Sequence, residues 1–289
     1  MRIIKQKGDP SGKSRRFWEA VFTEDTKKFL DYYYSNKIPD ANFYFLTDHE
    51  EIVSMLHLNP YQIRWHGKKC TAYYIVAVAT KEAYRHRGYM RTLLQEAVRD
   101  AEASQCPFLF LMPADPAIYE PFGFTYVYAH ALYEPVDEEI AQAVRTAVLQ
   151  GSAQVSRTAV LQENTQIKEW HLRRYTEHDA EELAAYAERE LENRYPVFCL
   201  HDPAYLNRLS GELKSENGDL VLIYDKDGRL SGYVCYACEE EEYYQEVILT
   251  GDAGRLFSLK ERKPMIMAKM TGGEDISELK GACYFPEIV

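Results

Sequence analysis

The chain has 289 residues, of which 46% are hydrophobic and 27% are charged, and its formal net charge is −11. This length predicts about two domains, and the composition is typical of a globular protein that can bury a core. The acidic balance argues against a nucleic-acid partner, which requires a broad positive field. No apolar run approaches the roughly 18 residues of a membrane span, and the N-terminus has no signal-peptide pattern. We therefore expect a cytoplasmic protein with no membrane partner.

The six cysteines are scattered along the chain, which is typical of a reducing compartment. Cys235 and Cys238 have the C-x-x-C spacing of some zinc and redox sites. They lie in a strand-like run, however, where residues three apart point to opposite faces of the sheet. No second cysteine pair or histidine cluster accompanies them, so we expect no metal site.

In the first part of the chain, residues 14–36 are predicted to be helical, with a break at residues 23–25. Tyr32, Tyr33 and Tyr34 follow one another there. Two interpretations remain open for them: one buried ring with two half-exposed rings, or a lining of a substrate site. Strands are then predicted at 42–47 and 51–58, joined by a turn, with a continuing meander at 62–65 and 70–79.

The most informative stretch is residues 72–103. It begins with an apolar, β-branched and aromatic run at 73–78, which predicts a buried strand. A helix is predicted after it, because the apolar residues recur with a 3.6-residue period at Met90, Leu93, Leu94, Ala97, Val98 and Ala101.

A basic turn with a single glycine, Gly88, connects this strand and helix. A helix N-terminus has unpaired N–H groups and favours an anion, and the turn adds the charges of Arg85, Arg87 and Arg91. Phosphate is the expected ligand. The turn is neither a P-loop nor a dinucleotide G-x-G-x-x-G motif, because it lacks Gly-Lys-Ser/Thr and has only one glycine.

Further elements complete a recognisable order. A strand at 108–112, a short helix at 117–122 capped by Gly123, and a strand at 124–129 follow the helix. This order resembles the GNAT acyltransferases, whose Arg/Gln-x-x-Gly-x-Gly/Ala loop holds the pyrophosphate of acetyl-CoA. The sequence Arg85-His86-Arg87-Gly88-Tyr89-Met90 fits that loop, with Met90 in place of the usual small residue. With Met90 at this position and basic residues continuing to Arg91, the loop resembles that of the Eis (enhanced intracellular survival) branch.

The resemblance implies where acetyl-CoA would bind. In GNAT folds the strand before the loop has a bulge that separates it from the next strand, and its backbone binds the pantetheine arm. The corresponding positions here are Val78, Ala79 and Thr80. The pyrophosphate would contact mainly backbone amides of the loop, which comprises Arg85, His86, Arg87, Gly88, Tyr89, Met90 and Arg91. No metal is implied.

Tyr119 matches the tyrosine that GNAT enzymes use as general acid toward the sulfur of coenzyme A. An unperturbed tyrosine has a pKa of about 10, above the roughly 8.5 of a thiol, so it is protonated at neutral pH. The alternative is a core tyrosine that packs near Phe122 and Phe124.

The general base is implied less directly. In Eis-type enzymes the terminal carboxylate enters the active site, and here that group belongs to Val289. The apolar tail that precedes it predicts docking rather than fraying. The alternative is a tail that only packs on the second domain. Further candidate carboxylates are Asp48, Glu50 and Glu51, although turn chemistry also explains them.

The second half of the chain has a weaker signal. Arg145-Thr-Ala-Val-Leu-Gln150 recurs as Arg157-Thr-Ala-Val-Leu-Gln162, which we interpret as a local duplication in a connector. The elements that follow repeat the order of the first half without the basic turn: strands at 166–172, 220–224, 230–237, 243–249 and 264–270, and helices at 179–193 and 203–213. The acidic run at 239–242 is predicted to be a solvated face, or else a site for a polycation.

The prediction is therefore a mixed α/β sheet fold. It has a GNAT domain at 1–137, a connector at 138–163 and a degenerate GNAT-like domain at 164–289. The chain ends before the sterol-carrier-like third domain of Eis proteins. The resemblance implies an acetyl-CoA-dependent N-acetyltransferase that acts on a primary amine of a small cationic molecule or a protein lysine, and a homo-oligomer. The alternative is a non-catalytic acyl-CoA-binding or sensing module.

Overall fold

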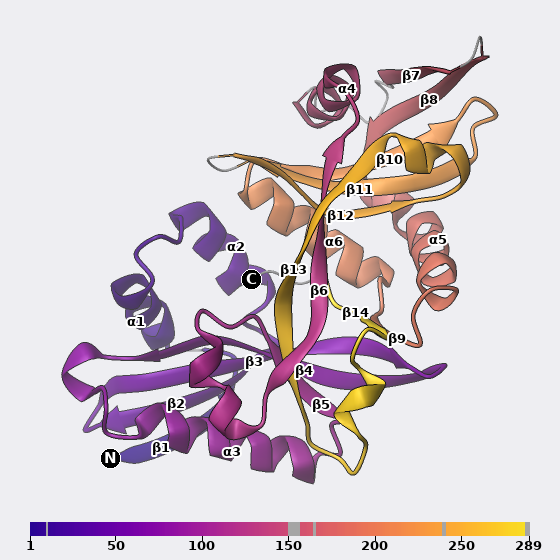
Figure 1. The fold of residues 1–289 in the computed structure, drawn as a ribbon. Helices are drawn as coiled ribbons and strands as arrows, with labels where there is room; N and C mark the ends of the chain where they lie inside the picture. Colours follow the sequence, from indigo (N-terminus) through magenta and orange to yellow (C-terminus); the bar gives the residue numbers. More distant parts are fainter. Residues whose placement is uncertain (10, 150–156, 164–165, 239–240, 287–289) are drawn as a thin grey trace. The chain divides into compact units, whose positions relative to one another are not determined.

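The computed structural model describes residues 1–9, 11–149, 157–163, 166–238 and 241–286. The chain forms two compact units (Figure 1). The first comprises Met1–Ala129, Tyr195–Leu200 and the residues from Pro264 onward, and the second comprises His130–Arg194 and His201–Lys263. Helices and sheets occur in both, and one sheet contains parallel and antiparallel pairs. The predicted mixed α/β fold is confirmed.

The first unit is built on a sheet whose strands follow in the order β1-β2-β3-β4-β5-β13-β6. Neighbouring strands from β1 to β4 are antiparallel, whereas β4 and β5 are parallel. The strands are β1 (Arg2–Lys7), β2 (Asn42–Asp48), β3 (Glu51–Trp65), β4 (Lys68–Thr80), β5 (Phe108–Leu111), β13 (Phe257–Met270) and β6 (Thr125–Pro135). Two short strands extend it: β9 (Val197–Cys199) pairs with β3, and β14 (Cys283–Tyr284) pairs with β9.

Helices cover both faces of this sheet (Figure 1). α1 (Lys13–Val21) and α2 (Lys27–Asn36) lie on one face, and α3 (Tyr89–Ala103) lies on the other. The break between α1 and α2 confirms the prediction for residues 23–25. Tyr33 is buried and its two neighbours are half-buried, as the first of the two interpretations predicts. α3 packs through the predicted stripe, with Leu93, Leu94, Ala97 and Ala101 buried.

β3 is longer than predicted, because it runs without a break past Pro60. Proline has no N–H and is usually confined to edges or gaps in a sheet. Here β2 pairs with β3 only as far as Leu58, and β9 begins to pair at Ile63. Pro60 therefore lies in the gap between two neighbouring strands, where a missing donor removes no ladder bond on that side.

The second unit has an antiparallel sheet in the order β12-β11-β10-β8-β7. Two helices, α5 (Ala180–Glu192) and α6 (Pro203–Ser215), lie in sequence between β8 and β10, as α1 and α2 lie between β1 and β2. This order repeats that of the first unit. After β12, however, a short 3₁₀ turn (Gly251–Arg255) replaces the basic loop and α3. The strands are β7 (Arg157–Glu163), β8 (Gln166–Arg174), β10 (Asp219–Asp225), β11 (Leu230–Cys238) and β12 (Glu242–Leu249).

The two units differ from the predicted consecutive ranges 1–137, 138–163 and 164–289. The predicted connector contains α4 (Glu138–Leu149), which buries Ile140 and Val144 in the core of the second unit. Conversely, the last strands return to the first unit, where β13 pairs with β5. Each unit therefore contains segments that are distant in the sequence and are joined by strand pairing. Of the acidic run, Glu239 and Glu240 lie outside the described residues.

Candidate functional site

The predicted bulge is present in β4. Val76 pairs with His57 and Ala79 pairs with Met55, so Ala77 and Val78 together oppose a single residue of β3. Ala77 has a φ of 54°, in the left-handed region that non-glycine residues seldom adopt. This bulge redirects the end of β4.

β4 and β5 separate just before the bulge. Their parallel pairs are Tyr73 with Leu109 and Tyr74 with Phe110, and no pair is recorded beyond these in the described residues. β4 itself continues to Thr80. The end that contains Val78, Ala79 and Thr80 therefore has no neighbouring strand on the β5 side, as predicted. Two of its carbonyls have partners, since Ala79 O accepts from Ser54 Oγ (3.0 Å) and Thr80 O accepts from Arg85 Nε (3.2 Å).

The basic loop lies between a 3₁₀ turn (Glu82–Tyr84) and α3. His86 (φ 62°) and Gly88 (φ 78°) are both left-handed. No side chain caps the N-terminus of α3, and residues 85–88 are exposed. Alternation into the left-handed region near a helix start turns backbone N–H groups toward one side, which makes an anion site. The geometry of the loop therefore fits a phosphate group, with Tyr89 and Met90 in the first helical turn.

The three arginines of the loop are held by local contacts. Arg85 bonds to Thr80 O, and Arg87 Nη2 donates to Ala83 O (2.9 Å). The Arg91 guanidinium lies 4.9 Å from the ring centroid of Phe122, in a cation–π contact. These side chains supply positive charge beside the loop. The contact of Arg91 also joins the start of α3 to the segment that contains Tyr119.

Tyr119 lies between two 3₁₀ turns, Pro116–Ile118 and Glu120–Phe122, where a single short helix was predicted. The predicted left-handed cap at Gly123 is present (φ 84°). Tyr119 is 7% exposed, and its ring centroid lies 6.0 Å from that of Phe124. Its hydroxyl has no hydrogen-bond partner in the described part of the chain. Burial raises the pKa of Tyr119 to about 12, so the phenol is protonated at neutral pH.

The C-terminal tail docks on the first unit. Phe285 is fully buried, and its ring centroid lies 5.5 Å from that of Phe108 and 5.1 Å from that of Phe110, both on β5. Phe285 therefore packs on β5 of the first unit, whereas the alternative interpretation placed the tail on the second domain. Val289, the predicted base, lies outside the described residues.

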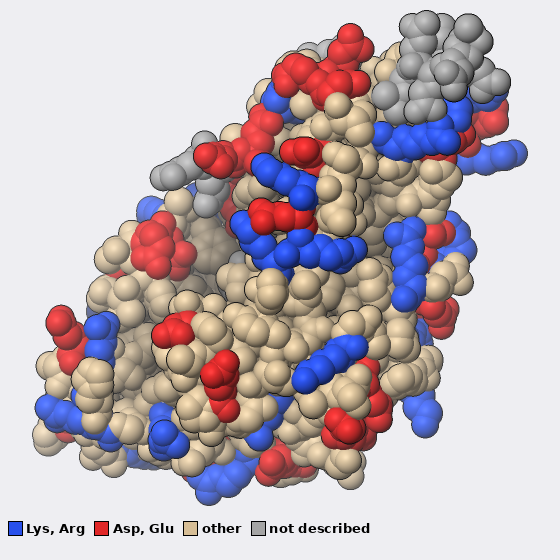
Figure 2. All heavy atoms as spheres, in the orientation of Figure 1, with Lys and Arg blue, Asp and Glu red and all other residues tan. Residues whose placement is uncertain are grey.

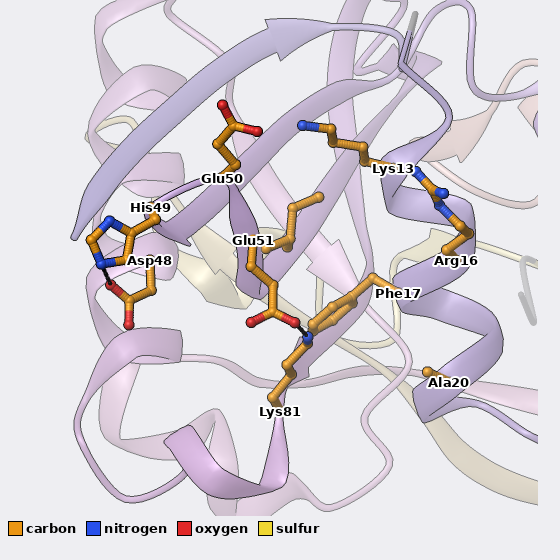
Figure 3. A pocket seen from close by; sticks show the side chains of 10 residues that line it. Lys13, Arg16, Phe17, Ala20, Asp48, His49, Glu50, Glu51 and Lys81 are labelled. Carbon is orange, nitrogen blue, oxygen red and sulfur yellow. Dashed lines mark hydrogen bonds and ion pairs between the residues drawn. The ribbon is translucent and has the colours of Figure 1, made fainter.

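A cavity of about 630 Å³ lies beside the end of β4 (Figure 3). It is bounded by α1, by the turn between β2 and β3, and by Lys81, which directly follows Thr80. The three further candidate carboxylates, Asp48, Glu50 and Glu51, all line it. Sequence reasoning missed the contribution of α1, because nothing in residues 13–20 marks them as facing a turn that lies more than 25 residues further along the chain.

No group of three or more potential metal ligands occurs among the described residues. Cys235 is buried and Cys238 is half-buried, and none of the six cysteines, all of them in the described ranges, forms a disulfide. In the part of the chain that the structure describes, no helix has the length and apolarity needed to cross a membrane.

Comparisons with known proteins agree with this geometry. Residues 3–127 match the family described as Acetyltransferase (GNAT) domain, which supports acyl transfer as the class of reaction. A comparison with curated proteins found no match.

The solved structures that resemble this chain show the same fold. A probable N-acyltransferase from Enterococcus faecalis is 15% identical, with a TM-score of 0.63, over 94% of this chain and 73% of that one. Eis1 from Mycobacterium abscessus is 10% identical, with a TM-score of 0.60, over 94% and 74%. A tandem GNAT protein from the clavulanic acid biosynthesis pathway is 10% identical, with a TM-score of 0.54, over 95% and 99%. The mixed α/β fold with two GNAT-like parts therefore has solved counterparts.

Proposed function

We propose that this protein is an acetyl-CoA-dependent N-acetyltransferase that transfers an acetyl group to a primary amine. The observation that supports this most strongly is the opening between β4 and β5, with its bulge at Ala77, directly before the left-handed loop at His86 and Gly88. The extended backbone edge of β4 and the uncapped N-terminus of α3 thereby lie close together in the sequence. They match the two chemical parts of coenzyme A, an amide-containing arm and a pyrophosphate.

The proposed reaction is a direct attack. The amine nitrogen attacks the carbonyl carbon of the thioester, the carbon–sulfur bond breaks, and the departing thiolate takes a proton from Tyr119. Burial raises the pKa of Tyr119 to about 12, so the phenol is protonated at neutral pH and can donate to the departing sulfur. The proton that the amine releases replaces the one that the thiolate takes, which keeps the step balanced. Backbone N–H groups near Val78 would stabilise the oxyanion.

The acceptor and the base belong to the same proposal. The acceptor is a small amine or a protein lysine, in a cytoplasmic protein of the Eis branch that forms a homo-oligomer. The terminal carboxylate of Val289 would assist deprotonation of the amine, and Phe285 holds the preceding segment against β5.

Figure 2 shows acidic and basic side chains interspersed on the visible face, which supports a partner other than nucleic acid.

The first test is release of free thiol from acetyl-CoA with a panel of aminoglycosides, polyamines and lysine peptides. Thiol release with one class of amine is expected and would identify the acceptor. Binding of acetyl-CoA by calorimetry without thiol release would favour the non-catalytic binding module. Failure to bind acetyl-CoA would contradict the proposal as a whole.

The second test is Tyr119→Phe. This change removes the phenolic proton and keeps the ring, so we expect kcat to fall about 10²- to 10⁴-fold, the usual range for a general acid. The affinity for acetyl-CoA should stay unchanged in calorimetry. Tyr126→Phe, at a half-buried tyrosine of β6, is the matched control. Equal turnover in the two variants would show that Tyr119 is only a core residue.

A further inference from the structure

The lining of the cavity beside the end of β4 includes apolar side chains. Its volume of about 630 Å³ lies within the roughly 300–1,000 Å³ of small-molecule sites. Phe17 and Ile52 form part of the lining and are 5% and 6% exposed, and Ala20 also lines the cavity. The Lys81 ammonium lies 6.0 Å from the ring centroid of Phe17. An occupant would therefore contact the small exposed parts of these apolar side chains.

One wall of the cavity carries unpaired positive charge. Lys13 and Arg16 lie three residues apart on α1, so they share one side of the helix. Neither side chain has an ion-pair or hydrogen-bond partner among the described residues. Lys81 also lines the cavity, but its ammonium pairs with Glu51. Two exposed cations on α1 thus have no charged partner among the described residues.

The opposite wall carries negative charge. Glu50 has no partner within the described ranges, and Figure 3 shows that Lys13 extends toward it across the cavity without pairing. Asp48 accepts a hydrogen bond from the hydroxyl of Tyr84 (3.1 Å) and lies 4.0 Å from His49 Nε2. The cavity is therefore electrostatically divided, with free cations on the helix side and a free carboxylate on the turn side.

We propose that this cavity binds a small zwitterion with an apolar side chain, namely an amino acid or a short peptide. The ligand carboxylate would lie against Lys13 and Arg16, its ammonium against Glu50, and its side chain on Phe17 and Ile52. A polycation is disfavoured by the helix wall and a polyanion by the turn wall, so only opposite charges on one molecule match both. This binding does not require acyl transfer and goes beyond the proposed function.

The site is also joined to the proposed cofactor loop. Tyr84, which donates to Asp48, belongs to the 3₁₀ turn that leads into the loop, and its ring contacts the Arg87 guanidinium at 5.3 Å. A ligand bound at the turn between β2 and β3 would therefore lie beside Asp48, which is linked through Tyr84 to Arg87 of the loop.

The experiment is calorimetry with the full chain in the absence of acetyl-CoA. The zwitterionic probe is leucyl-leucine, and two matched probes each lack one charge: the C-terminal amide, which keeps the ammonium, and the N-acetyl form, which keeps the carboxylate. We expect each single-charge probe to bind about tenfold more weakly than the zwitterion, since each loses one charge-assisted contact.

Two variants give a crossed test. Lys13→Ala with Arg16→Ala should weaken the N-acetyl probe about tenfold and leave the amide probe unchanged, whereas Glu50→Gln should do the reverse. Lys226→Ala, at an exposed turn of the second unit, is the control and should change neither.

A crossed pattern with these probes would establish the zwitterion site. Equal losses for both probes in both variants, or no loss in either variant, would overturn the proposal. Absence of leucyl-leucine binding at millimolar concentration would overturn it too. None of these results depends on thiol release, so failure of this proposal and failure of the proposed acetyltransferase activity are distinguishable.

Discussion

Single residues with left-handed backbones shape the candidate cofactor loop. Gly88 is the last residue before α3, and an added Cβ there would meet no protein atom within 4 Å. The space beside it is therefore open to a ligand, and the absence of a side chain allows close approach of an anion to the backbone. Gly67, in the turn between β3 and β4, has the same conformation (φ 80°) and equally open space, but it lies outside the loop.

A comparison of Gly88→Ala with Gly67→Ala should distinguish backbone strain from an effect on acetyl-CoA binding. Both Gly88→Ala and Gly67→Ala force an alanine into the left-handed region, so each should lower the free energy of unfolding by about 1–2 kcal/mol. Only Gly88→Ala should also weaken acetyl-CoA binding, by roughly tenfold or more in calorimetry, because its methyl group occupies the approach of the pyrophosphate. Equal affinities in the two variants would exclude the loop as the phosphate site.

His57 is a buried histidine on β3, surrounded by aromatic rings. Its ring centroid lies 3.9 Å from that of Phe43 and 5.5 Å from that of Trp18. Neither ring nitrogen has a hydrogen-bond partner in the described structure. Burial lowers its pKa to about 3 from an ordinary 6.5, although the charge of Asp9 acts in the opposite direction.

This pKa predicts a pH-dependent stability. Between pH 6.5 and 3 the unfolded chain binds a proton at His57 and the folded chain does not, so stability falls as the pH is lowered. One such proton gives a slope of about 1.4 kcal/mol per pH unit. His57→Met should reduce the slope between pH 6 and 4 in urea titrations, whatever its effect at pH 7. An unchanged slope would mean that His57 is protonated in the folded state. His49→Gln, at an exposed histidine, is the control.

Among the elements, β4 is the one on which the site depends. Its bulge places Ala77, a buried residue, in a left-handed conformation, and β5 separates from β4 just before this residue. The last pair between β4 and β5 is at Tyr74, three residues before Ala77, while β3 continues to pair with β4 on the other side. The bulge and the end of pairing with β5 thus lie within a few residues of one another on the same strand.

Replacement of Ala77 by glycine tests this geometry. Glycine adopts φ 54° without steric cost, so Ala77→Gly should be close to neutral or slightly stabilising. Ala72→Gly, at a fully buried and regularly paired position of the same strand, should cost about 1 kcal/mol. Thermal unfolding of the two variants gives the comparison. A larger loss for Ala77→Gly than for Ala72→Gly would contradict the assigned bulge.

At the scale of the whole molecule, the first unit is completed by segments from the end of the chain. Phe285 stacks on Phe110 with an interplanar angle of 28°, and Cys283 and Tyr284 pair with β9. β13 supplies the strand next to β5. Residues 1–129 alone would therefore leave β5 with an open edge and an uncovered aromatic face.

Phe285→Ala should measure this dependence. Removal of a fully buried phenylalanine side chain leaves a cavity and typically costs about 3–5 kcal/mol. We expect a loss of this size in denaturant unfolding, with faster amide exchange in β5. Phe122→Ala, at a half-buried phenylalanine, should cost less. A loss below 1 kcal/mol would mean that the tail does not contribute to the core of the first unit.

The repeated sequence Arg-Thr-Ala-Val-Leu shows most directly what local sequence leaves undecided. Its first copy, residues 145–149, lies in α4, and its second copy, residues 157–161, lies in β7. Val148 is buried in the helix at 5% exposure, whereas its counterpart Val160 is 38% exposed in the strand. Helix and strand periods place the same residue on different faces, so neighbouring elements decided the structure of each copy.

The sequence alone determined the elements and motifs that depend on short-range chemistry. The stripe of α3, the basic turn with Gly88, the break between α1 and α2, and the mixed α/β fold all follow from periodicity, capping and turn preferences. Tertiary structure alone decided which distant segments meet. The tail on β5, β13 beside β5, and the cavity between α1 and the turn after β2 all depend on contacts that no local pattern encodes, because packing joins residues irrespective of their separation in the chain.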